Sequence, residues 1–157
     1  MSKSVYLETS FISYLTGPFS RDLVVAANQQ ITQDWWAKRK KDFKLFISEF
    51  VFQEARKGDS EASKKRVLIL ESLPILETNE AAITLAEKFI RSKIIPKKAT
   101  QDSLHIAIAT IHEMNYLLTW NCTHIANAEI QKGIAKITQS EGYEMPIICT
   151  PSELMGG

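Results

Sequence analysis

The sequence predicts a single α/β domain with a mainly parallel central sheet of about five short strands and helices on both faces. Short apolar runs alternate with longer segments in which apolar residues recur at helical spacing. The helical segments are long enough for right-handed crossovers between parallel strands. The chain has 157 residues, 45% hydrophobic and 24% charged, which suits one ordinary core. We therefore treat residues 1–157 as one domain.

The first part of the chain predicts two strands and three helices. In chain order we expect a strand over 5–7, a brief helix over 11–15, a helix over 23–35 that continues to the basic residues at 38–41, a strand over 45–47 and a helix over 50–57. Ser20 and Ser48 are the expected N-caps. Gly17-Pro18 and Gly58 are expected to stop helices.

The second part repeats the alternation. We expect a helix that opens at Asp59 or Ser60, a strand over 75–76, a helix from Thr78 to about 90, a helix over 99–114, a strand over 116–120, a helix over 134–140 and a strand over 147–149. Thr78 is the expected cap of its helix, Asn115 the residue that ends the next one, and Gly142 the end of the last helix.

Overall charge and cysteine content select no particular partner and predict no disulfide. Nineteen basic and 18 acidic residues give a formal charge of +1, so overall charge selects no polyanionic or polycationic partner. Nucleic-acid contact would need local basic patches, of which the chain offers 38–41, 64–66 and 97–98, each also typical of a solvated helix face. Cys122 and Cys149 have no paired spacing and are expected to be reduced thiols.

Nothing in the sequence predicts a membrane partner. No apolar run approaches the ~20 residues of a membrane span, and the first residues lack the apolar stretch of a signal peptide. A cytoplasmic location is therefore the default expectation.

Four polar residues are predicted to meet at one edge of the sheet. Glu8 follows the first strand and Asn121 follows the fourth, and the carboxyl ends of parallel strands share an edge where sites form. Asp102 lies in the first turn of the helix that leads to the fourth strand. Glu54 lies about 9 Å along the helix that leaves the second strand, which keeps it within reach.

Three carboxylates in one cleft favour a hard divalent cation, Mg²⁺ or Mn²⁺. Zinc is disfavoured because no pair of His residues has ligand spacing, despite Cys122-Thr123-His124. A magnesium site of this kind points to phosphodiester hydrolysis. Each acid could instead be only a helix cap or a partner of the helix dipole. His105, one turn after Asp102, could contact substrate or be a satisfied core residue.

Four segments carry a resemblance to a known family. They are Tyr6-Leu7-Glu8-Thr9-Ser10, the helix Gln53-Glu54-Ala55-Arg56-Lys57-Gly58-Asp59, the helix Asp102-Ser103-Leu104-His105-Ile106-Ala107, and the strand and loop from Leu118 to Asn127. In order and spacing they resemble the PIN-domain family, in particular the VapC-type toxin ribonucleases of prokaryotic toxin–antitoxin pairs. The third segment is the most specific match.

The resemblance implies a compact α/β nuclease that cleaves RNA with Mg²⁺ or Mn²⁺, usually as a homodimer and restrained by a small antitoxin. It places Glu8, Glu54 and Asp102 at the family's acidic positions as catalytic residues and metal ligands. The chain departs from the pattern twice. Glu8 replaces the more usual Asp, and Asn121 stands where a fourth acid often stands.

On this hypothesis, Ser10 and Thr119 would donate hydroxyl hydrogen bonds around the metal ligands, and Asn121 would act through its amide. A second hypothesis is a degenerate PIN domain that binds RNA or protein without hydrolysis, which the missing acid at Asn121 motivates. A third is another Mg²⁺-dependent phosphotransfer enzyme, against which the chain has no Gly-rich phosphate loop. The apolar segment 23–35 could serve the core, a dimer or an antitoxin groove.

Overall fold

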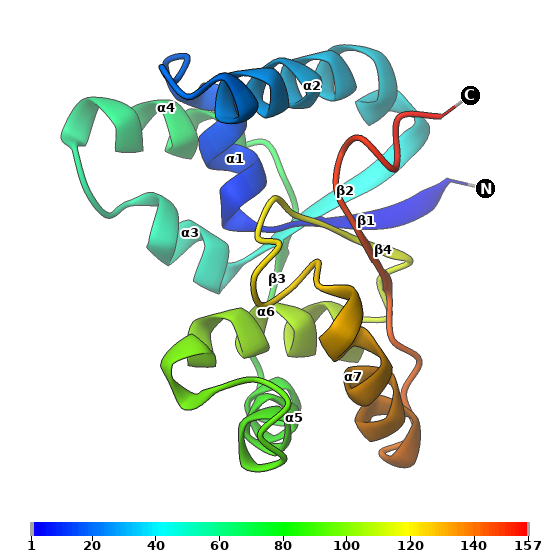
Figure 1. Cartoon of the computed structure of the whole chain (residues 1–157). Coiled ribbons are helices and arrows are strands. Elements are labelled where there is room, and N and C mark those ends of the chain that lie inside the picture. The colour runs from blue at the N-terminus through cyan, green and yellow to red at the C-terminus, as the bar shows by residue number, and fades with distance from the viewer. Residues whose placement is uncertain (1, 157) are drawn as a thin grey trace.

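The computed structural model describes residues 2–156 and shows one central sheet with helices on both sides (Figure 1). The sheet has five parallel strands in the order β3-β2-β1-β4-β5. The strands are β1 (Lys3–Leu7), β2 (Phe43–Ser48), β3 (Ile75–Leu76), β4 (Tyr116–Leu118) and β5 (Ile147–Cys149). The predicted fold class is confirmed.

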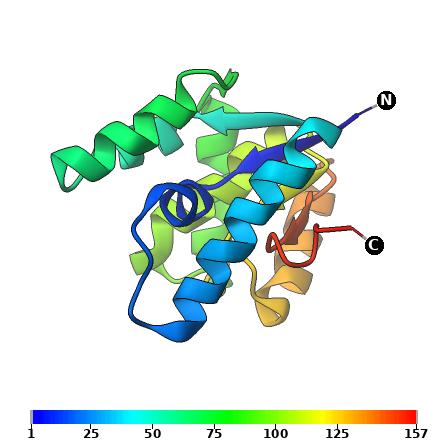
Figure 2. The same ribbon diagram turned by 90° about the horizontal axis from the view of Figure 1, so that it is seen from above.

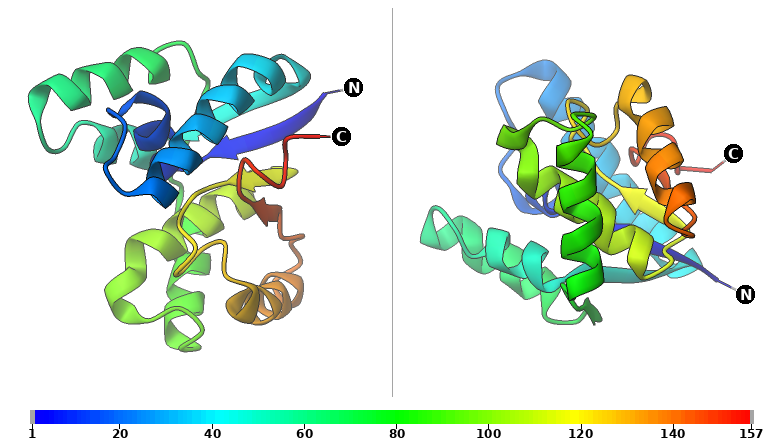
Figure 3. Two further views of the ribbon diagram at one scale, coloured as in Figure 1. Left: turned by 45° about the horizontal axis from the view of Figure 1, so that its top comes forward. Right: turned by 90° about the horizontal axis from the view of Figure 1, so that it is seen from below.

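Seven α-helices lie among the described residues. They are α1 (Thr9–Thr16), α2 (Leu23–Arg39), α3 (Glu49–Ala55), α4 (Ser60–Leu70), α5 (Glu80–Arg91), α6 (Thr100–Ile111) and α7 (Ala128–Ser140), with short 3₁₀ turns η1 (Lys40–Asp42) and η2 (Lys97–Ala99). Figures 1 and 2 show α1 and α2 over one face of the sheet. The right panel of Figure 3, which is seen from below, shows α5, α6 and α7 over the other face.

The strand order turns around at β1. In the register, Val5 pairs with Leu45 of β2 on one side and with Tyr116 of β4 on the other. The chain first builds the sheet outward through β2 and β3, then returns to add β4 and β5 on the opposite side of β1. Such a reversal opens a crevice at the carboxyl ends of the two strands that flank it. The fold therefore directs attention to the ends of β1 and β4.

Trp35 shows that part of the apolar segment of α2 serves the core. Its side chain is fully buried, with Phe11 edge-on at 5.6 Å and Phe43 stacked at 5.7 Å between ring centroids. Its indole Nε1 donates to the carbonyl of Leu154 at 3.1 Å, which satisfies the buried donor. This part of α2 belongs to the core, whereas Leu23 at the start of the helix is 85% exposed.

Two predicted N-caps are wrong by one or two residues. Asp22, not Ser20, caps α2, and its carboxylate accepts from the backbone N–H of Val24 and Val25. Asn79, not Thr78, caps α5 and accepts from Ala82 N. In each case an Asp or Asn oxygen lies within reach of the orphan amides of the first turn, and the hydroxyl residue precedes it.

Three observed boundaries differ from the predicted ones. Strand β4 ends at Leu118, two residues early, and α7 begins at Ala128, six residues before the expected start. Helix α6 ends at Ile111 and closes with Glu113, not Asn115, in the left-handed conformation at φ 58°. The bonds from Met114 N to Ala109 O (3.0 Å) and from Glu113 N to Thr110 O (3.1 Å) complete this closure.

Among residues 2–156, the search for a helix both long and apolar enough to span a bilayer finds none.

Candidate functional site

The backbone at the crevice is held by bonds that extend the sheet beyond its strands. Glu8 N donates to Leu118 O at 3.1 Å, and Thr119 N donates to Cys149 O at 3.0 Å. Glu8 and Thr119 are therefore the first residues beyond β1 and β4, and both are buried, at 5% and 0% exposure. The prediction that Glu8 projects at the carboxyl edge agrees with this position.

The Glu8 carboxylate is surrounded by hydroxyl groups. Its Oε1 accepts from Ser10 Oγ and from Thr119 Oγ1, both at 2.5 Å. Its Oε2 accepts from Ser10 N at 3.1 Å, so Glu8 also caps the start of α1. The structure thus places Ser10 and Thr119 directly against the first acid. Hydrogen bonds of this kind fix the position of a carboxylate.

Glu54 reaches the same place from α3. Ser48 caps the start of this short helix by accepting from Val51 N, and the helix ends at Ala55. Glu54 Oε1 accepts from Thr9 Oγ1 and lies 2.7 Å from His105 Nε2. The Glu54 side chain is 19% exposed, so its other oxygen remains open to solvent or to a ligand.

His105 lies between the two carboxylates and is 1% exposed. Its Nε2 is 2.7 Å from Glu54 Oε1 and 3.9 Å from Glu8 Oε2. Its Nδ1 is 2.7 Å from Tyr6 Oη, which in turn lies 2.8 Å from Ser48 Oγ. His105 is a satisfied core residue, which was one of its two predicted alternatives, and it also touches the acids. Contact with substrate stays a prediction.

His105 and Glu54 stabilise each other's charged forms. Burial alone would lower the pKa of His105, but the hydrogen bond to Glu54 and the negative charges of Glu8 and Glu54 raise it above the usual value. Burial alone would raise the pKa of Glu54, yet the hydrogen bond and charge of His105 lower it overall. An imidazolium beside a carboxylate is therefore favoured, and it offsets the repulsion between the acids.

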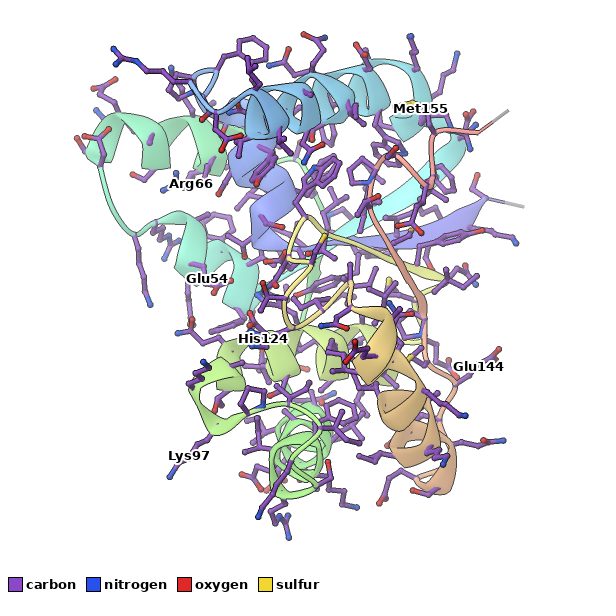
Figure 4. All side chains as sticks on the ribbon, viewed as in Figure 1. Glu54, Arg66, Lys97, His124, Glu144 and Met155 are labelled. Carbon is purple, nitrogen blue, oxygen red and sulfur yellow. The ribbon has the colours of Figure 1, made fainter. Side chains whose placement is uncertain are left out.

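Asp102 and Asn121 lie in a second, more exposed group. Asp102 Oδ2 is 3.1 Å from His124 Nδ1, with the side chains 23% and 24% exposed. Asn121 Oδ1 accepts from His124 N at 3.1 Å and from Thr123 N at 3.2 Å. In Figure 4, Glu54 on α3 and His124 on the loop after β4 both lie above α6, which carries Asp102 and His105.

We call Glu8, Glu54 and His105 the buried group, and Asp102, Asn121 and His124 the rim group. One potential ligand atom from each member of the buried group lies within 4.8 Å of the others. The structure thus brings two of the three predicted metal ligands together and adds His105. Asp102 is not part of this closest set, although its charge contributes to the raised pKa of His105.

Sequence reasoning missed four residues that contact the site. Thr9 lies between two predicted residues and bonds to Glu54, and His124 bonds to Asp102. Ser48 was interpreted only as a cap and Tyr6 only as a strand residue. The one available signal was the run of hydroxyl residues Thr9-Ser10 directly after Glu8. The contacts of Tyr6 and Ser48 depend on how β1, β2 and α6 pack.

Comparison with known proteins supports the fold. No family model matches the sequence, and no curated protein matches it either. The VapC20 toxin of Mycobacterium tuberculosis, described as cleaving the sarcin–ricin loop, has a similar structure, with a TM-score of 0.60 and 13% identity over 76% of this chain and 91% of that chain. The VapBC2 complex of Rickettsia felis, bound to a DNA fragment from its promoter, is also similar. Its TM-score is 0.53 and its identity 14%, over 94% of this chain and 98% of that chain.

The chain therefore has the PIN-domain fold of VapC toxins. In this chain the candidate site lies at the carboxyl end of β1, where the strand order reverses.

Proposed function

We propose that the protein is a metal-dependent endoribonuclease and the toxin of a toxin–antitoxin pair. The observation that carries the proposal is the buried group, where two carboxylates meet at the strand reversal between β1 and β4. The similarity in fold to VapC toxins supports the same function. The roles of Glu8, Glu54 and Asp102 as metal ligands, and of Asn121 as a catalytic residue, are part of this proposal.

The side chains of the buried group fit a hard divalent cation. Within residues 2–156, Glu54 Oε2 has no hydrogen-bond partner, and Glu8 Oε2 accepts only from Ser10 N. Each acid therefore keeps oxygen lone pairs for a ligand, while its other oxygen is fixed by two hydroxyl groups in Glu8 and by Thr9 and His105 in Glu54. Carboxylate oxygens are the ligands that Mg²⁺ and Mn²⁺ prefer. Glu8 and Glu54 would hold the ion, with Asp102 as the third acid.

Mg²⁺ or Mn²⁺ would supply Lewis-acid polarisation of the scissile phosphate and a lower pKa for the attacking water. The protein's own residues would keep the site in shape for this chemistry. Ser10 and Thr119 fix Glu8, and Thr9 and His105 fix Glu54. Asn121 keeps only its Nδ2 donor free, because loop amides occupy its oxygen. Hydrolysis would leave a 5′-phosphate and a 3′-hydroxyl.

Of the three predicted basic patches, one is free to contact the phosphates of a polyanionic substrate. Arg66 is engaged with the carbonyls of Ala55 and Lys57 at 3.0 and 2.7 Å, and Arg39 pairs with Asp42 at 3.0 Å, so two of the predicted basic patches partly hold the fold together. The third patch, 97–98, is the 3₁₀ turn directly before α6. Within the described part of the chain its lysines form no ion pair, which leaves them available to RNA phosphates.

The same proposal includes an antitoxin as the protein partner of this chain. The Rickettsia felis neighbour is a VapBC complex, which supports a cognate antitoxin for this chain. A homodimer and a cytoplasmic location stay predictions.

The test is cleavage of structured and unstructured RNAs by the purified protein with Mg²⁺, Mn²⁺ or EDTA. We expect metal-dependent cleavage that Glu54→Gln and Asp102→Asn abolish, because the shape survives and the anionic ligand does not. Glu61→Gln is the matched control, since Glu61 is 79% exposed on α4. Undiminished cleavage by Asp102→Asn would remove Asp102 from the site.

One observation favours a second function. Asn121 lacks the charge of an acid, and its oxygen is spent on the loop after β4. A non-catalytic domain that binds RNA or protein would tolerate this. A folded wild type that binds RNA, cleaves none under any metal condition and binds no Mn²⁺ would establish that alternative.

A further inference from the structure

A chain of hydrogen bonds crosses the core and ends at the buried group. It runs from Ser48 Oγ to Tyr6 Oη (2.8 Å), from Tyr6 Oη to His105 Nδ1 (2.7 Å), and from His105 Nε2 to Glu54 Oε1 (2.7 Å). Its members come from β2, β1, α6 and α3 in turn. Ser48 and Tyr6 are fully buried and touch neither carboxylate in the hydrogen-bond network. Neither has a role in the proposed reaction so far.

The chain of bonds has one consistent direction when His105 is neutral. Ser48 Oγ accepts from Val51 N at 3.0 Å, so its own proton is available to Tyr6 Oη. The Tyr6 hydroxyl then donates to His105 Nδ1. This leaves the ring proton on Nε2, where it faces Glu54.

The same atoms remain satisfied when His105 is protonated. Nδ1 then donates to Tyr6 Oη, whose proton turns to Ser48 Oγ. Burial raises the pKa of Tyr6 well above its usual value, so the hydroxyl stays protonated and can serve in either direction. In both states the Nε2–H of His105 points at Glu54 Oε1, so the orientation of the ring does not depend on its charge.

We propose that Tyr6 is a positioning residue that sets the orientation of the His105 ring and, through it, the position of the Glu54 carboxylate. The side chain of a buried histidine with a partner on only one nitrogen can rotate or change tautomer, whereas a partner on each nitrogen fixes both. Glu54 depends on this because its Oε1 has only two donors, Thr9 and His105. For metal binding, the inference rests on the proposed function.

The test compares Tyr6→Phe with Thr110→Val in the full-length chain. Tyr6→Phe removes one hydroxyl and keeps the buried ring. Thr110 is also fully buried, lies on the same helix as His105, and donates only to Ile106 O at 2.7 Å. Both variants therefore delete one buried hydroxyl, but only Tyr6→Phe breaks the chain of bonds. The readouts are imidazole nitrogen and proton NMR without metal, the Mn²⁺ dissociation constant, and the cleavage rate as a function of Mn²⁺ concentration.

We expect Tyr6→Phe to abolish the slowly exchanging His105 Nε2–H signal and to weaken Mn²⁺ binding about 10-fold, the scale typical of a lost partner behind a metal ligand. Cleavage should return to near the wild-type rate at saturating Mn²⁺, which loss of folded protein would not allow. Thr110→Val should match wild type in all three readouts. Identical NMR and Mn²⁺ results for the two variants would overturn the proposal.

Failure of the proposed function has a different signature. If wild type neither binds Mn²⁺ nor cleaves RNA, the nuclease proposal falls, while the NMR comparison still decides whether Tyr6 orients His105. If Tyr6→Phe does not fold, the wild-type spectrum decides. A slowly exchanging Nε2–H with an unprotonated, hydrogen-bonded Nδ1 in neutral His105 would support the proposal, and a freely exchanging ring proton would overturn it.

Discussion

The buried group and the rim group share helix α6 but differ in how they are held. His105, at 1% exposure, has a hydrogen-bond partner on each ring nitrogen, and Glu8 accepts three hydrogen bonds. Asp102 has one partner among the described side chains, His124, and both are about one-quarter exposed. Two residues three apart on one helix thus enter environments of different polarity. Helical spacing puts them on one face, but it does not set their depth.

The difference predicts which group contributes to stability. We expect Glu8→Ala to lower the free energy of unfolding by about 3 kcal/mol, because it removes a helix cap and leaves the buried Thr119 hydroxyl and the half-buried Ser10 hydroxyl without their carboxylate acceptor. Asp102→Ala should cost less than about 1 kcal/mol, as is typical of exposed pairs. Urea denaturation in EDTA measures both. Equal losses would show that the two groups are held alike.

A pH titration separates the groups further. The pKa of His105 is raised on folding, so the stability it contributes is present below the unfolded value near 6.5 and is lost as pH rises through the raised value. The pKa of Glu54 is lowered, so its contribution is present above its unfolded value and is lost as acid takes the pH down through the lowered one.

We therefore expect the stability difference between wild type and His105→Gln, measured without metal, to be largest between the unfolded pKa of Glu54, about 4.5, and that of His105, about 6.5. The difference should shrink at lower and at higher pH. Thr110→Val, on the same helix, removes no titratable group and is the control, whose stability difference from wild type should not vary with pH. A His105→Gln difference that does not vary with pH would contradict the assigned ion pair.

The hydroxyl groups around Glu8 offer a smaller perturbation. Thr119→Val keeps the side-chain shape but removes the bond to Glu8 Oε1, and we expect about 10-fold weaker Mn²⁺ binding. Thr138→Val deletes another buried hydroxyl, bonded only to Ala135 O on α7, and should leave Mn²⁺ binding unchanged. Calorimetric titration of both variants makes the comparison. Equal affinities would mean that the Thr119 bond does not position Glu8 for the metal and that the two bonds from Ser10 suffice.

The smallest expected effect comes from restoring an acid to the rim. Asn121→Asp keeps the oxygen that accepts from His124 N and Thr123 N, so the free energy of unfolding should change by less than about 0.5 kcal/mol. The added charge should strengthen Mn²⁺ binding about threefold, as expected for a solvent-screened carboxylate near a cation. No gain in Mn²⁺ affinity would place Asn121 outside the reach of the metal.

Sequence reasoning located the site through the strands. Because carboxyl ends of parallel strands share an edge, Glu8 and Asn121 could be placed at that edge before any packing was known. The position of Glu54 followed from its distance along α3. The interposition of His105 could not be foreseen, because it depends on how α6 crosses β1 and α3. Nor could the pairing of Asp102 with His124, since it depends on a loop that carries no periodic pattern.

The two ladder bonds beyond β1 and β4 also set how the site exchanges with solvent. The amides of Glu8 and Thr119 are bonded to Leu118 O on the central strand β4 and to Cys149 O on the neighbouring strand β5, and both residues are buried, so their protons should exchange with deuterium only when the whole domain unfolds. The amides of Thr123 and His124 rest on one Asn121 side chain and should exchange through local opening. One wall of the site would then keep its shape for the lifetime of the native state, while the other is renewed many times within it.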